Sequence, residues 1–128
     1  AIVAVNAFGH IVNPATGAIV AGARDADGNL VDTIKLMLGF TPPTPQFGNT
    51  TIGVIITDAN LDKAACNELA NAAHAGLART IRPVFTQADG DTLFALSAPA
   101  ADAPPANLFL LGIAAAEVVA EAVLGISG

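Results

Sequence analysis

Thr50 lies at a sharp junction, between a proline-rich segment and a run of β-branched residues. A threonine at the start of a strand often reflects β-propensity and nothing more. If the Asn49–Thr50 bond breaks, however, Thr50 gains a free α-amine with a pKa of about 7.7 to 8.0, which can accept the hydroxyl proton near neutral pH. Gly48 and Asn49 tolerate the unusual backbone conformation that attack on the preceding carbonyl requires. Thr50 is therefore either a strand residue or an N-terminal nucleophile.

Three further polar residues have positions that suit catalysis. Asp89 and Asp91 flank a glycine just before a second apolar run. They form either a simple aspartate-rich turn or a pair whose shared field raises one pKa and orients a hydroxyl and an ammonium. Asn6, after the first β-like segment, is either a turn residue or an amide that donates to an oxyanion.

Other chemistries find little support. His10, His74 and the single cysteine, Cys66, lack the spacing of a zinc site, so we predict no metal. A Ser-His-Asp arrangement stays open, although no nucleophile elbow is present. No phosphate-binding or dinucleotide glycine pattern occurs, so we predict no cofactor. Residues 24–32 lack the glycine and glutamate of a calcium loop at the required places and predict an exposed Asp-Gly turn.

The composition indicates one domain that buries much of its surface against other polypeptide. The 128 residues are 53% apolar and only 12% charged, which favours burial against a partner or in an oligomer over a compact alanine-rich monomer. The net charge of −6 and the scattered basic residues argue against nucleic-acid binding. One cysteine and no visible signal peptide favour the cytoplasm. The start at Ala1 without methionine suggests processing or a piece of a longer product. Residues 108–123 are too short and charged to span a membrane and predict a buried helix.

The remaining patterns predict a layered α/β or α+β domain. Residues 41–48 carry three prolines and predict a loop, whereas residues 32–40 show no clear period. Gly76 lies inside a predicted helix and leaves room for a neighbouring element. Strands are expected at 1–5, 10–12, 18–21, 50–57 (buried) and 92–98, and a short extended piece at 84–85. Helices are expected at 61–82, with Asp58, Asn60 or Asp62 as the cap, and from about 105 or 107.

Three stretches in order resemble one family over nearly the whole chain: IVAVNAFGHIVNPATGAIVAGAR from Ile2, GNTTIGVIITDA from Gly48 and AHAGLARTIRPVFTQADGDTLFAL from Ala73. They are similar to DmpA-type L-aminopeptidase/D-amidase-esterases, self-processing enzymes that include β-aminopeptidases and 6-aminohexanoate-oligomer (nylon oligomer) hydrolases. The resemblance implies that Thr50 becomes the nucleophile when the bond after Asn49 is cut. It implies that Asp89 and Asp91 lie next to that nucleophile and that Asn6 stabilises the oxyanion.

The resemblance also implies a four-layer αββα sandwich and oligomers of α/β-subunit pairs. Residues 1–49 would end the larger α subunit, and residues 50–128 would form the smaller β subunit. The expected partner is the N-terminal polypeptide, which carries a catalytic lysine and much of the substrate pocket; Lys35 and Lys63 lie in unrelated stretches and do not replace that lysine.

Two other functions stay open. The sequence also resembles, more distantly, ornithine acetyltransferases, which have an autocleaved threonine before a similar strand; Asp-Gly-Asp-Thr and the Gly-Asn before Thr50 favour the hydrolase. A non-catalytic subunit that completes an oligomer is the structural alternative. Short peptides, β-amino amides and 6-aminohexanoate oligomers are all open as substrates.

Overall fold

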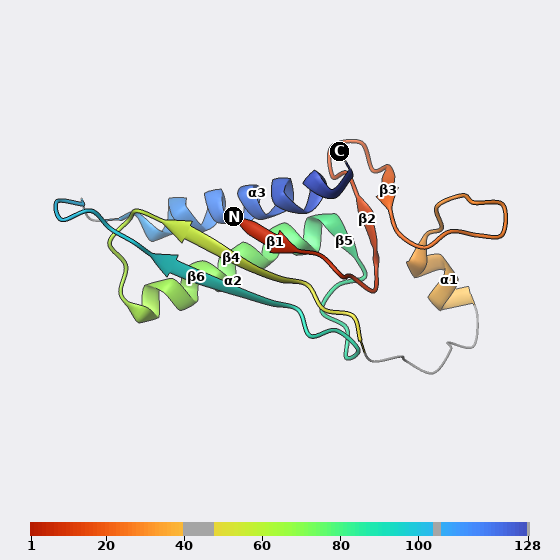
Figure 1. The fold of residues 1–128 in the computed structure, drawn as a ribbon, viewed down its shortest axis with the longest axis horizontal. Coiled ribbons are helices and arrows are strands. Elements are labelled where there is room, and N and C mark those ends of the chain that lie inside the picture. The colour runs from red at the N-terminus through yellow and green to blue at the C-terminus, as the bar shows by residue number, and fades with distance from the viewer. Residues whose placement is uncertain (40–47, 104–105, 128) are drawn as a thin grey trace.

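The computed structural model describes residues 1–39, 48–103 and 106–127 and is built around a three-stranded sheet in the order β1-β4-β6 (Figure 1). The central strand, β4 (Ile52–Thr57), is antiparallel to β1 (Ile2–Ala4) and parallel to β6 (Thr92–Ser97). Parallel strands need a long crossover, and helix α2 (Lys63–Thr80) supplies it. The N-terminal ends of β4 and β6 and the C-terminal end of β1 therefore share one edge of the sheet.

Helices α2 and α3 (Leu108–Leu124) cover the same face of this sheet (Figure 1). The Asp62 carboxylate accepts a hydrogen bond from the Ala65 N–H and caps α2, while Asn107 caps α3 in the same way. Gly76 permits the close helix contact expected from the sequence, because a Cβ there would lie 2.4 Å from the Ala116 carbonyl oxygen. The core between sheet and helices includes Ile55, Leu69, Leu77, Leu93, Val119 and Val123.

A second small sheet, in the order β3-β2-β5, lies beside the first. It consists of β3 (Ile19–Ala21), β2 (His10–Val12) and β5 (Ile81–Arg82), with the short helix α1 (Thr33–Gly39) next to β2 and a 3₁₀ turn (Gly125–Ser127) after α3. The Asp25 carboxylate accepts from the Asp27 and Asn29 amides, which confirms the predicted Asp-Gly turn.

The α+β class and most element positions are confirmed, three predictions were wrong, and one helix was not predicted. The long helix ends at Thr80, because Ile81–Arg82 pair with β2. Residues 33–39, which lack a clear period, form α1. Phe85 is not extended but has a φ of 56°. Neither β4 nor α3 is fully buried, since each exposes one face that carries large apolar side chains.

Two other expectations concern the proline-rich loop and a possible membrane-spanning helix. The proline-rich loop predicted at 41–48 lies, except for Gly48, outside the described residues. Within the residues that the structure describes, no helix combines the length and hydropathy needed to cross a bilayer, α3 included.

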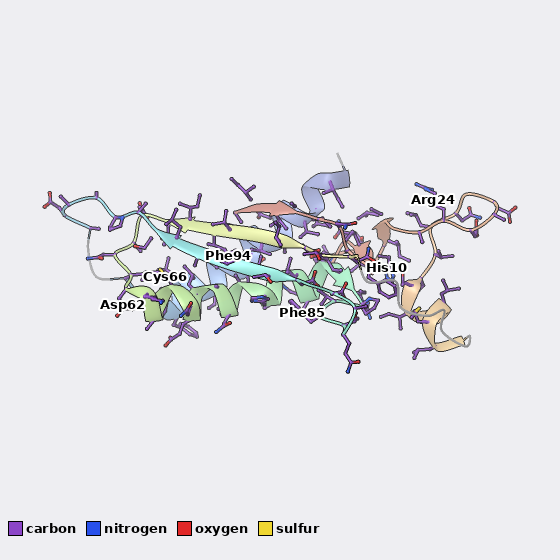
Figure 2. All side chains as sticks on the ribbon, turned by 60° about the horizontal axis from the view of Figure 1, so that its bottom comes forward. His10, Arg24, Asp62, Cys66, Phe85 and Phe94 are labelled. Atoms are coloured by element: carbon purple, nitrogen blue, oxygen red, sulfur yellow. The ribbon has the colours of Figure 1, made fainter. Side chains whose placement is uncertain are left out.

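His10 gives the fold a predicted pH dependence. It lies at the end of the molecule near α1 (Figure 2), is buried, and accepts the Thr33 N–H at Nδ1 over 2.9 Å. Burial lowers the pKa of His10, with Arg82 acting in the same direction and Asp32 opposing. Because the unfolded chain takes up this proton near pH 6.5 and the folded chain resists it, stability should fall as the pH drops below about 6.5. Urea unfolding at pH 7.5 and 5 measures this; a His10→Gln variant with the same pH loss would contradict it.

Candidate active site

The Asn49–Thr50 peptide unit is held between two neighbouring segments at the shared edge of the sheet. On one side, the Thr50 N–H donates to the Asn6 carbonyl oxygen over 3.0 Å, just beyond the end of β1. On the other, Asn49 forms a parallel bridge with Asp89, so the ladder of β4 and β6 extends past both strands. The fold therefore brings together all four residues that the sequence predicts for the site, Asn6, Thr50, Asp89 and Asp91.

The Asn49 carbonyl oxygen receives two hydrogen bonds. The Thr50 hydroxyl donates to it over 2.7 Å, and the Gly90 N–H donates to it over 3.2 Å. The first places a nucleophilic oxygen beside the carbonyl group that it would attack. The second polarises the same carbonyl, as an oxyanion-hole donor does.

The Asn6 side chain binds the carbonyl oxygen of Gly48, one residue before Asn49, whose carbonyl oxygen an oxyanion donor would bind. Its side-chain Nδ2 donates to the Gly48 carbonyl oxygen over 3.0 Å, and the Asn49 side-chain amide donates back to the Asn6 carbonyl oxygen over 3.4 Å. In this arrangement Asn6 fixes the segment before the junction. A shift of one residue along the chain would be needed for its amide to reach the Asn49 oxygen.

The Asp91 carboxylate joins the loop before β6 to the start of β4. One oxygen accepts the Thr51 N–H over 2.7 Å, and the other accepts the Phe85 N–H over 3.2 Å. The residue after the candidate nucleophile is thereby anchored by a charged acceptor, which is stronger than a neutral one. Phe85 is also held from the other side, because its ring lies 5.1 Å from the ring of His74.

The Asp89 carboxylate is bound within its own loop. Its Oδ2 accepts the Thr86 hydroxyl over 2.6 Å and the Thr86 N–H over 3.0 Å. Both acidic side chains thus hold main chain around the junction, and neither has a hydrogen bond to the Thr50 hydroxyl. Their position on either side of Gly90 nevertheless places them next to Thr50, because a Cβ at Gly90 would lie 2.9 Å from Thr50 Oγ1.

Gly90 is the site residue that the sequence reasoning missed. The signal was its place between the two aspartates, which we interpreted only as a turn. Asn49 does not have a positive φ, so no left-handed residue directly precedes the bond that would be cut. The distinguishing feature of the junction is the pair of donors on the Asn49 oxygen.

Neither histidine takes part in this arrangement. His10 is bonded to Thr33, and His74 Nδ1 is 2.8 Å from the Ala70 carbonyl oxygen. Over the described ranges, no group of three or more His, Cys, Asp or Glu side chains could hold a metal ion. The chemistry available at the junction is therefore that of a hydroxyl, two carboxylates, an amide and main-chain N–H groups.

Removing the Asp91 carboxylate should loosen the site. In Asp91→Ala the buried Thr51 N–H loses its acceptor, and a buried donor left without a partner costs about 1 to 3 kcal/mol, whereas the exposed Phe85 N–H can bond to water instead. We expect a loss of stability in that range and slower cleavage at the junction. Urea unfolding and intact-mass time courses measure the two effects; Asp91→Asn, which keeps one acceptor oxygen, should be intermediate. Equal behaviour of Asp91→Ala and the parent protein would contradict this role.

Comparison with known proteins agrees with this site. A family model described as Peptidase family S58 matches residues 1–125. An uncharacterised aminopeptidase of Mycobacterium tuberculosis is 43% identical over 139 residues, which cover 94% of this chain and 40% of that protein. A 6-aminohexanoate-oligomer endohydrolase of Paenarthrobacter ureafaciens is 34% identical over 139 residues, covering 97% and 39%. The chain belongs to peptidase family S58, the DmpA-type family that its sequence resembles.

Proposed function

We propose that this chain is the part of a self-processing amide hydrolase that carries the nucleophile, Thr50. One observation supports the proposal above all: the Thr50 hydroxyl and the Gly90 N–H converge on the Asn49 carbonyl oxygen. The chain spans 40% of the length of its mycobacterial relative, so the activity proposed is that of a longer enzyme.

In the first stage Thr50 Oγ1 attacks the Asn49 carbonyl carbon. The hydroxyl proton passes to the departing Thr50 nitrogen, and an ester forms between Asn49 and the Thr50 oxygen. The Gly90 N–H stabilises the negative charge that develops on the Asn49 oxygen during this step. Water then hydrolyses the ester and leaves a carboxylate on Asn49 and a free amine on Thr50.

In the second stage the free Thr50 amine is the general base. Its pKa of about 7.7 to 8.0 in an unperturbed chain allows it to take the hydroxyl proton as Oγ1 attacks a substrate amide. The Asn6 carbonyl oxygen, 3.0 Å from Thr50 N, accepts one amine hydrogen and orients the lone pair. Asp89 and Asp91 hold the surrounding main chain, and the Asn6 amide contributes to the oxyanion site once the segment before the junction has moved.

The uncovered face of the main sheet supports the proposal of a four-layer αββα sandwich. Opposite α2, which lies below the sheet in Figure 2, the sheet exposes a continuous apolar surface. Apolar patches of this kind are rarely left in water. A second sheet from the rest of the polypeptide would cover it, with residues 1–49 ending the α subunit and 50–128 forming the β subunit. The surface consists of Ile2, Ile52, Ile56, Phe94 and Leu96.

The proposed substrates are short linear amides. Relatives named aminopeptidase favour peptides, and those named 6-aminohexanoate-oligomer endohydrolase favour nylon oligomers. The residues that choose between them are proposed to lie in the N-terminal polypeptide, together with the catalytic lysine. The cytoplasmic location stays a prediction.

Intact mass spectrometry of the full-length protein, followed over time after synthesis, tests the proposal. We expect two fragments that separate between Asn49 and Thr50, and amine release from peptide amides or 6-aminohexanoate oligomers only after they form. Transfer of acetyl groups to ornithine without amide hydrolysis would favour the acyltransferase alternative. A stable, uncut chain without activity would support a purely structural subunit.

A further inference from the structure

The outer surface of the two long helices carries an apolar groove that faces away from the sheet. The groove has a volume of about 680 Å³ and runs between α2 and α3. Two of its large apolar side chains are open to solvent, Phe109 at 75% and Ile113 at 51% exposure. It is distant from the uncovered sheet face, because α2 and α3 pack on the opposite face of that sheet.

The α2 side of the groove is complementary to itself. Glu68, Ala72, Ala75 and Arg79 recur at intervals of four, three and four residues, so they form one stripe along the helix. The stripe has an acid at one end, a base at the other and two alanines between. If a second α2 lies antiparallel across it, each Glu68 meets an Arg79 and each Ala72 meets an Ala75.

On the α3 side of the groove, Ile113 is level with the centre of the α2 stripe. Contacts between the parallel helices place Ala72 next to Gly112 and Gly76 next to Ala116. The point midway between Ala72 and Ala75 is therefore level with Ile113. A two-fold axis that lies in the interface at that level, perpendicular to both helices, brings Ile113 close to its own copy.

We propose that the α2–α3 groove is an interface between two copies of this chain, related by a two-fold axis that lies in the interface, perpendicular to α2 and level with the midpoint between Ala72 and Ala75. The alanines allow close approach, while Phe109 and Ile113 lose their exposure. Arg79 already bonds Glu117 of its own chain over 2.7 Å, and its five N–H donors also accommodate Glu68 of the partner subunit. This inference does not depend on the proposed hydrolase activity; family resemblance implies an oligomer but names no surface.

A charge exchange tests the register. In the full-length protein, Glu68→Arg places two cations at each end of the stripe, and Arg79→Glu places two anions there. Each variant alone should dissociate at this interface, with at least about a tenfold rise in Kd. An equal mixture should reassemble, because the introduced arginine of one variant then meets the introduced glutamate of the other, and the original acid and base meet at the opposite end. Sedimentation velocity measures the masses, and Glu121→Arg, an equal charge change on exposed α3 outside the groove, is the matched control.

Cross-linking tests the axis without disturbing the charges. In a Cys66→Ala background, Ile113→Cys should form a disulfide between two chains under mild oxidation, whereas Glu121→Cys should not. Unchanged assembly of Glu68→Arg, failure of the mixture to reassemble, or a monomeric parent protein would overturn the proposal. A covalent link from residue 113 to another part of the same polypeptide, detected by introducing a second cysteine there, would show that the enzyme itself covers the groove and would equally overturn it.

Discussion

Replacing Thr50 with alanine is expected to leave a single uncut polypeptide and to lower amide hydrolysis by at least about 10⁴-fold. The Thr50 hydroxyl is the only side-chain donor to the Asn49 carbonyl oxygen among the described residues, at 2.7 Å. Without it, neither the ester at the junction nor an acyl-enzyme can form. Intact mass measures the first loss, and amine release from a peptide amide measures the second.

Two comparisons separate loss of chemistry from loss of structure. Thr50→Ser keeps a hydroxyl and should still be cut, more slowly because the stiff β-branched side chain is gone. Thr50→Ala should unfold at nearly the parent temperature, since the main-chain bonds from Thr50 N and Gly90 N do not involve the side chain. Normal fragments from the alanine variant would refute the assignment of Thr50.

Replacing Gly90 with alanine is expected to slow cleavage at the junction by about 100-fold while leaving the fold intact. The new Cβ would lie 2.9 Å from Thr50 Oγ1 and would turn the hydroxyl away from the Asn49 oxygen. The backbone itself should tolerate alanine, because Gly90 does not have a positive φ. The rate of fragment formation by intact mass, together with the thermal midpoint, measures both parts of this prediction.

Gly48→Ala is the matched control. Gly48 also lies near Thr50, but a Cβ there meets nothing within 4 Å. This variant should be cut at close to the parent rate. If both alanine variants were equally slow, backbone flexibility would explain the effect, and the contact between Gly90 and Thr50 would lose its significance.

The four residues predicted for the site lie together in the structure, but the sequence did not show why. Asn6, Thr50 and the two aspartates are far apart in the chain, and only family resemblance joined them before the structure was known. The structure shows the physical cause: three strand ends share one edge of a sheet. Single-residue patterns do not encode strand order, so this convergence was beyond local reasoning.

The misses have a common physical origin in tertiary contacts. Ile81 and Arg82 continue the helical pattern, yet pairing with β2 takes them into a sheet. The apolar run of β4 predicted burial on both faces, but only one face of the strand is covered by helices of this chain. Hydrophobicity alone does not show whether the layer that covers the other face belongs to the same stretch of chain. The Gly90 N–H was missed for a simpler reason: a main-chain donor has no characteristic residue type, and the only signal was the position of Gly90 between two aspartates.

The pairing of β1 with β4 has a consequence for what happens after the cut. These strands lie on opposite sides of the Asn49–Thr50 bond and remain joined by their own ladder. Hydrolysis would thus turn a single chain into an interlocked pair of chains. Folding, until then unimolecular, would become a bimolecular reaction that depends on concentration. After denaturation, the two fragments of the cleaved protein would have to associate again in order to refold. The lifetime of the folded protein would then be set by its unfolding rate.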